Sequence, residues 1–152
     1  MLDYTIMGNT QSIHKINFED VQYALNNKNS YLLINTLSEA EQECLIPNTV
    51  LANQEENTIN KYLKKYLKDI KIIVYGKNCN DEKIYIKYNQ LSALGFYNVQ
   101  IYTGGLFEWL MLQDIFWSDE FPTTKKELDI LKYKPAKQHN LLEYWSMFHT
   151  IP

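Results

Sequence analysis

Arginine is absent from this chain of 152 residues, and all 15 of its basic residues are lysine. A mechanism that needs a guanidinium group to hold an oxyanion through two parallel hydrogen bonds is therefore excluded. The lysines nearly balance 18 acidic residues, which leaves a net charge of −3. No run of like charges is long enough to form a nucleic-acid-binding arm or an acidic tail, so we expect no nucleic acid among the partners.

Long apolar runs are also absent. No stretch approaches the roughly 20 residues that a membrane-spanning helix needs, and residues 1–11 lack the basic start and apolar middle of a signal peptide. We therefore expect a cytoplasmic protein that contacts no membrane. The length of the chain is typical of one domain with a proper hydrophobic core.

Cysteine is scarce, because the chain has only Cys44 and Cys79, far apart, without a CxxC motif or a histidine at metal-binding spacing. The sequence therefore predicts no disulfide framework, no metal site and no bound cofactor. The position of Cys44 in a turn that leads to a proline indicates a small, buried packing residue. His14, His139 and His149 follow no catalytic spacing with an acidic residue, and we expect them at the surface or in the tail.

The apolar residues that are present alternate between strand-like runs and helical stripes. The predicted strands cover residues 31–34, 50–52, 72–75 and 99–102, and the predicted helices start at Asn17 and Ser38 or cover residues 59–70, 84–94 and 106–112. This alternation indicates an α/β fold, with a central, mostly parallel β-sheet and helices on both faces. Ligands in such folds bind beyond the carboxyl ends of the strands, and the loop after residues 72–75 contains Cys79.

Residues 115–152 are interpreted as a C-terminal helical extension that packs on the same domain, of which residues 1–114 form the main part. Thr124 and Glu127 have the spacing of a helix capping box, which predicts one more helix with Leu128 and Leu131 as its apolar positions.

Four large apolar residues near the C-terminus fall on one face of a further predicted helix: Leu141, Leu142, Trp145 and Phe148. This stripe has two interpretations. The helix packs on its own domain, or it forms a surface for a protein partner or for self-association.

Several motifs match the pattern of a known family. Leu94-Gly95-Phe96 closes a helix, a short strand follows, and residues 104–109 read Gly-Gly-Leu-Phe-Glu-Trp. Upstream, residues 32–35 and 44–47 lie where the family has a strand ending in Asp-x-Arg and a Gly-His-Ile-Pro motif. Over roughly residues 12–114 the chain thus resembles a rhodanese-like domain of the rhodanese/sulfurtransferase superfamily.

The resemblance implies a central parallel sheet wrapped by helices. Active members of this family carry a sulfane sulfur as a persulfide on a loop cysteine, which loop amides surround at the N-terminus of a helix. Carried over to this chain, the resemblance makes Cys79 the candidate persulfide acceptor, because amides and a helix dipole favour a thiolate. The residues that would surround it are Gly76, Lys77, Asn78, Asn80, Asp81, Glu82 and Lys83.

The chain departs from the family pattern at this loop. In active members the cysteine directly follows the strand, where this chain has Gly76, and Cys79 comes three residues later. The usual glycine and the closing arginine of the loop are missing. Formal charges within the loop cancel, since two lysines accompany Asp81 and Glu82.

Three more positions that are charged in the family have lost their charge here. Asn35 replaces an aspartate, Leu37 replaces an arginine and Leu45 replaces a histidine. The side chains that normally support the loop cysteine are therefore absent from this sequence.

Three hypotheses for the function follow. These departures favour a rhodanese-like binding or structural module without catalysis, a pseudoenzyme. The alternative is a thiosulfate- or persulfide-dependent sulfurtransferase, or a persulfide carrier, that uses Cys79. The third is a phosphatase of the same fold, which the absence of arginine disfavours.

Overall fold

The computed structural model describes residues 12–139, which build a five-stranded sheet in the order β1-β5-β4-β2-β3 with parallel neighbours throughout. The strands are β1 (Lys15–Ile16), β2 (Tyr31–Asn35), β3 (Thr49–Val50), β4 (Lys71–Tyr75) and β5 (Val99–Tyr102). The α-helices are α1 (Phe18–Leu25), α2 (Glu55–Lys64), α3 (Lys83–Ala93) and α4 (Gly105–Phe116). Single 3-10 turns add Lys28–Ser30, Glu39–Glu41, Ala52–Gln54 and Ile130–Tyr133.

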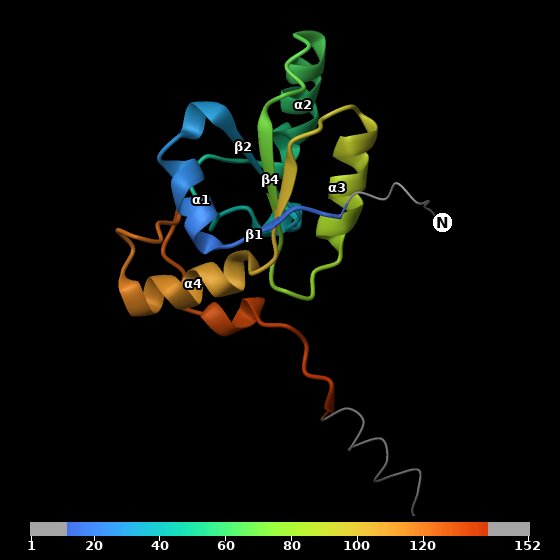
Figure 1. Ribbon diagram of the computed structural model, residues 1–152. Coiled ribbons are helices and arrows are strands. Elements are labelled where there is room, and N and C mark those ends of the chain that lie inside the picture. Colours follow the sequence, from blue (N-terminus) through green and yellow to red (C-terminus); the bar gives the residue numbers. More distant parts are fainter. Residues whose placement is uncertain (1–11, 140–152) are drawn as a thin grey trace, which may run out of the picture.

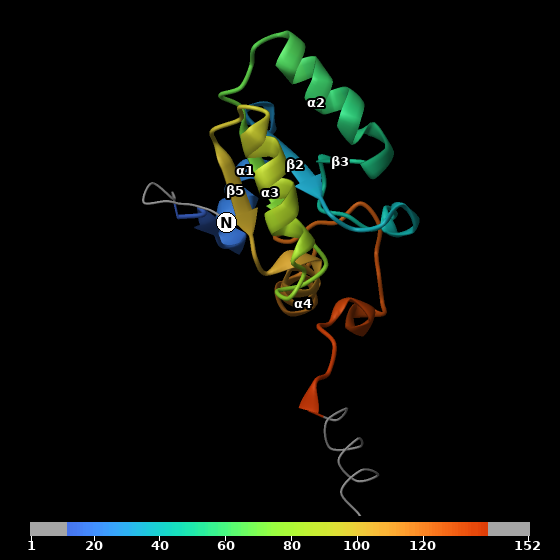
Figure 2. The ribbon, with the colours of Figure 1, turned by 90° about the vertical axis from the view of Figure 1, so that its right-hand side faces the viewer.

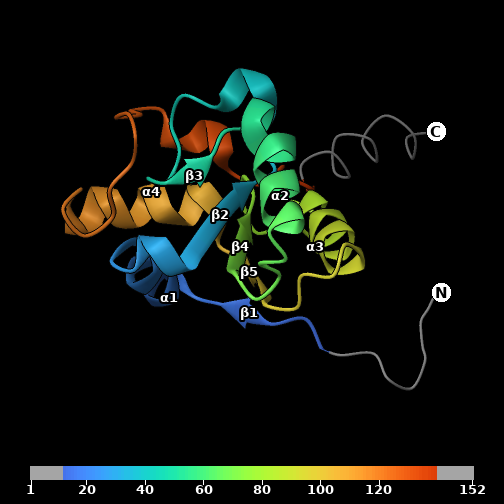
Figure 3. The same ribbon diagram turned by 90° about the horizontal axis from the view of Figure 1, so that it is seen from above.

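Helices cover both faces of the sheet, as Figure 1 and the view from above in Figure 3 show. Alternate residues of β4 point to opposite sides, so Ile73 packs with α1 and α4, while Ile72 packs with α2 and α3. All four apolar residues of β4 are fully buried, as expected for the central strand of a sheet that is covered on both faces. The predicted fold class is confirmed.

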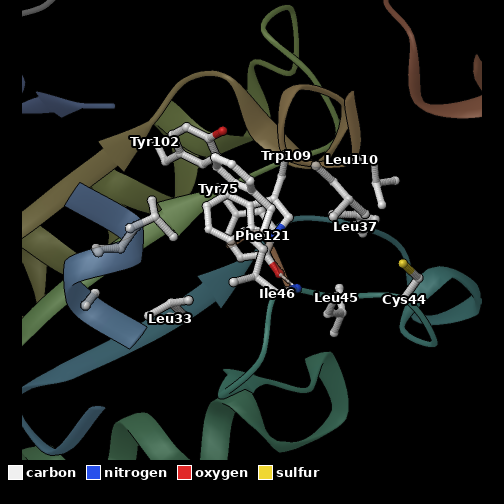
Figure 4. Packing of buried hydrophobic residues seen from close by; sticks show 14 of the residues in the cluster. Leu33, Leu37, Cys44, Leu45, Ile46, Tyr75, Tyr102, Trp109, Leu110 and Phe121 are labelled. Carbon is white, nitrogen blue, oxygen red and sulfur yellow. Dashed lines mark hydrogen bonds between the residues drawn. The ribbon is translucent and has the colours of Figure 1, made fainter. Parts of the chain in front are cut away.

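The core continues beyond α4 into the C-terminal segment. Phe121 and Tyr133 are buried in the same cluster as Trp109, and the Trp109 indole N–H donates to the carbonyl of Pro122 over 2.8 Å. Figure 4 shows Trp109 and Phe121 beside Tyr75 in the middle of this cluster, with Cys44 toward one side. Residues after 114 therefore complete the hydrophobic core.

The helix predicted from the capping box at Thr124 is wrong. The Thr124 hydroxyl accepts the backbone N–H of Leu45 over 3.0 Å and donates to the carbonyl of Glu43 over 2.8 Å. Because these long-range bonds hold the segment against residues 43–45, it forms no helix at Thr124, and only Ile130–Tyr133 forms a 3-10 turn.

The helix predicted over residues 59–70 has different bounds. It starts earlier, at Glu55, and ends at Lys64. Two residues later, Tyr66 adopts a φ of 57°, and its side chain is 85% exposed. The N–H of Leu67 then donates to the carbonyl of Tyr62, which closes the helix as a Schellman motif. The apolar spacing continues past Lys64, but the chain must reverse there to enter β4.

Other boundaries differ by less. The helix predicted from Ser38 is the single turn Glu39–Glu41, the strand predicted at 50–52 is β3, and α4 extends to Phe116. β1 was not predicted, because two residues form no recognisable pattern. Among residues 12–139, no helix is long and apolar enough to cross a membrane. The stripe from Leu141 to Phe148 lies outside the described residues.

Candidate functional site

The loop that carries Cys79 connects β4 to α3 at the carboxyl edge of the sheet, and residues 76–82 are called the cysteine loop below. Two of its carbonyls are bound by the first turn of α4. The N–H of Leu106 donates to the carbonyl of Gly76, and the N–H of Phe107 donates to that of Lys77, each over 2.9 Å. Helix N-termini have free N–H groups, and here they hold the loop.

The Gly-Gly turn before α4 permits this contact. A β-carbon on Gly105 would lie 2.8 Å from both the Asn78 nitrogen and the Gly76 oxygen. Any side chain at this position would therefore push the cysteine loop away from α4.

Cys79 lies at the exposed tip of the loop. The polar atom near its sulfur is Oδ1 of the adjacent Asn80, at 3.9 Å. Within residues 12–139, no backbone N–H donates to this sulfur. We expected loop amides to surround the Cys79 sulfur, but in the structure they do not bind it.

Four amides, three in the loop and that of Lys83 at the start of α3, instead bond within this segment. The N–H of Asn80 donates to the Asn78 side chain over 2.9 Å, and the N–H of Asp81 donates to the Asn78 carbonyl over 3.2 Å. The N–H groups of Lys77 and Lys83 both donate to the Asp81 carboxylate, over 3.1 and 3.0 Å. These four donors have no capacity left for a bound sulfur.

Asp81 occupies the centre of the arrangement. Besides the two amides, its Oδ2 accepts the Thr36 hydroxyl over 2.8 Å, which links the loop to the end of β2. A β-carbon on Gly76 would overlap this same oxygen and would lie 2.7 Å from the Thr36 Oγ1. The carboxylate of Asp81 therefore fills the space that a side chain at position 76 would need.

Sequence reasoning treated Asp81 as one loop residue among several and missed this role. An aspartate just before a helix is a common signal for a bond to the first helical amides, which Asp81 makes with Lys83. The contact with Thr36, 45 residues earlier, has no local signal.

The three positions that lack the family's charges contribute to structure instead. Leu37 and Leu45 are buried in the hydrophobic core. Asn35 is buried as well, and its side chain accepts the N–H of Leu37 over 3.0 Å and donates to the carbonyl of Val50 over 3.2 Å. No charge is available from these residues to a reacting group.

Two further contacts fix the cysteine loop. The Lys77 ammonium lies 3.0 Å from the Glu41 carboxylate. Partial burial alone would raise the pKa of Glu41, but hydrogen bonds from Lys77 and Ser38 outweigh it and hold this pKa below its usual value. The buried Asn78 amide donates to the carbonyl of Tyr133 over 2.8 Å, which ties the loop to the C-terminal segment.

The remaining candidates lie apart from the loop. Cys44 is buried, its thiol donates to the carbonyl of Lys125 over 3.2 Å, and burial raises its pKa. Its predicted packing role is confirmed. His14 and His139 are exposed, whereas His149 is not among the described residues. Within the described part of the chain, no cluster of three or more potential metal-ligating side chains occurs.

Taken together, the parallel sheet, the cysteine loop after its central strand and the Gly-Gly turn define an α/β protein of the rhodanese type. The family model described as Rhodanese-like domain matches residues 19–112, more than half of the chain. The chain therefore belongs to the rhodanese-like domain family. Curated protein sequences contain no match to it.

Solved structures share the fold at low sequence identity. The crystal structure of the Saccharomyces cerevisiae single-domain sulfurtransferase RDL2 has a TM-score of 0.54 at 17% identity, covering 75% of this chain and 99% of that one. The crystal structure of the Alr3790 protein from Anabaena sp. has a TM-score of 0.53 at 18% identity, covering 77% and 86%. The solution structure of the rhodanese-like domain of Alr3790 has a TM-score of 0.52 at 21% identity, covering 82% and 86%.

Proposed function

We propose that this chain is a rhodanese-like domain without sulfurtransferase activity, which serves as a binding module. The observation that carries the proposal is the position of the Asp81 carboxylate. It takes the space of a side chain at position 76, which is where active members of the family have their cysteine. It also accepts the N–H of Lys77 in the loop and the N–H of Lys83 at the start of α3.

A persulfide needs hydrogen-bond donors of the kind that bind the Asp81 carboxylate in this loop. In a persulfide site, loop amides and a helix N-terminus stabilise the negative charge on sulfur. Here the same kinds of donors bind a carboxylate that is part of the chain, so the negative charge is supplied internally. A second anion in the same place would be repelled by this carboxylate.

Cys79 does not compensate for this loss. A persulfide on Cys79 would be exposed to water, beside the carboxylates of Asp81 and Glu82 in sequence, and without an amide donor to its sulfur. The alternative function is a sulfurtransferase or persulfide carrier that uses Cys79. The exposure of Cys79 is the observation that favours this alternative, because a sulfur donor can reach the thiol.

Sulfur transfer from thiosulfate to cyanide separates the two functions. In the active case, the Cys79 thiol would take the outer sulfur of thiosulfate, release hydrogen sulfite, and pass that sulfur to cyanide as thiocyanate. We expect the wild-type chain to form thiocyanate no faster than its Cys79→Ala variant. Activity that is lost in Cys79→Ala but retained in the matched control Cys44→Ala would overturn the proposal.

A further inference from the structure

Six large apolar residues are exposed on α4 and the segment after it, and five of them form the set defined here, because the sixth, Phe116, lies beside Phe121. This set, called the α4 surface, consists of Met111, Ile115, Trp117, Leu128 and Leu131, with exposed fractions of 43%, 60%, 75%, 82% and 62%. Large apolar residues that cluster on a surface indicate a binding site more often than isolated ones do.

These residues lie on α4 or in segments close to it. Met111 and Ile115 are four positions apart and share a face of α4. Trp117 and Leu128 line the same hollow of about 180 Å³ at the end of the helix. The 3-10 turn Ile130–Tyr133, which contains Leu131, packs along α4.

Trp117 has a strained backbone as well as an exposed side chain. Its φ of 77° and ψ of 159° belong to a region that glycine adopts almost alone. Its N–H donates to the carbonyl of Gln113 over 2.8 Å, and its carbonyl accepts the N–H of Phe121 over 3.2 Å. Glycine would adopt this backbone conformation with less strain. The fold of the described residues therefore does not explain why a tryptophan occupies this position.

The chain itself contains a segment with the matching chemistry. Residues 140–152 follow the last described residue, and the sequence predicts that Leu141, Leu142, Trp145 and Phe148 share one helical face. A helix over residues 140–152 would be about 20 Å long. The 12-residue α4 is about 18 Å long, which is similar to the length of such a helix.

The direction of the chain favours docking on another molecule. Tyr133 is anchored to the cysteine loop through Asn78. From there, residues 134–139 are mostly exposed and run away from α4 in both Figure 1 and Figure 2. The described part of the chain therefore ends at His139 on a path that leads away from the α4 surface.

We propose that residues 141–148 of one copy dock on the α4 surface of a second copy, so that two chains exchange these segments in a symmetric dimer. Trp117 and Trp145 are the central apolar contacts, because tryptophan dominates the energy of many interfaces. The inference rests on the proposed binding role and gives it a partner, a second copy of this chain.

Sedimentation equilibrium of the full chain tests the dimer. We expect the wild type to be dimeric, and Trp117→Ser and Trp145→Ser each to weaken the dimer at least about tenfold. Tyr97→Ser is the matched control, since Tyr97 is 71% exposed and lies outside the α4 surface. Its dissociation constant should equal that of the wild type, and circular dichroism verifies that each variant is folded.

Mixing the two weakened variants gives a sharper test. Trp117→Ser retains an intact C-terminal segment and Trp145→Ser an intact α4 surface, so an equimolar mixture should form a heterodimer through one unaltered contact. A monomeric wild type would overturn the inference, including the case in which the segment covers its own Trp117. A dimer that Trp117→Ser leaves unchanged would overturn it too. Thiocyanate formation bears only on the proposed lack of catalysis, so the two failures are distinguishable.

Discussion

At position 76 the chain has room for a hydrogen atom and nothing larger. The oxygen that closes this space belongs to Asp81, and the bond from Thr36 and the two backbone amides hold it there. Gly76 and Asp81 are therefore a coupled pair, in which the small residue is required because the carboxylate is present.

A double-mutant cycle measures this coupling. We expect Gly76→Cys alone to destabilise the protein by about 1–3 kcal/mol, because the new side chain overlaps the carboxylate. Asp81→Ser alone also destabilises, since three hydrogen bonds are lost. Combined with Asp81→Ser, however, Gly76→Cys should cost about 1 kcal/mol less than it does alone. Chemical denaturation gives these free energies, and strictly additive values would contradict the coupling.

Sequence reasoning located the cysteine loop but not its internal bonds. The apolar run of β4 and the Gly-Gly motif placed Cys79 at the correct edge of the sheet, because both depend on local pattern. The contact between Thr36 and Asp81 joins two strand ends that only the folded sheet brings together. The use of the amides could therefore not be read from the loop residues alone.

Two helices of this protein end in the same way with different residues. In α3, Gly95 has a φ of 105°, and the N–H of Phe96 donates to the carbonyl of Leu91. In α2, Tyr66 takes the corresponding place with a φ of 57°. Gly95 indicates the end of α3 in the sequence, because glycine is common at this position of a helix end. Tyr66 gives no such signal for α2, since it continues an apolar stripe.

The left-handed tyrosine leads to a prediction for α2. Tyr66→Gly should raise the free energy of unfolding by up to about 1 kcal/mol, because the β-carbon is unfavourable at this φ and the exposed ring contributes little packing. Thermal unfolding gives the shift. Lys61→Gly, at an exposed position inside α2, is the control and should lower stability by about 0.5–1 kcal/mol. A lower melting temperature for Tyr66→Gly would contradict the argument.

On the scale of the whole molecule, the folded unit is longer than the family match. The match ends at residue 112, but Phe121 packs against Trp109 with ring centroids 5.0 Å apart, and Tyr133 is buried with them. The sequence predicted that residues 115–152 pack on the domain, but it did not identify Phe121 and Tyr133 as the core residues, because no periodic pattern includes them.

Truncation tests where the folded unit ends. A chain that stops at Asp114 loses Phe121, whose removal alone should cost about 3–5 kcal/mol, and loses Tyr133 as well. With a total stability of typically about 5–15 kcal/mol, this chain should be largely unfolded by circular dichroism. A chain that stops at His139 retains the core and should be folded and unfold cooperatively. Cooperative unfolding of the shorter chain would contradict this view of the core.

The carboxylate of Asp81 also changes what the loop can exchange with its surroundings. A group on the same chain has an effective concentration at its site that no dissolved anion easily matches, and it never leaves. A carrier of sulfur must alternate between an empty and a loaded state. If the proposed function is correct, the three bonds to Asp81 hold the loop in place without a dissolved anion, and the surface around it is the same for any molecule that binds there.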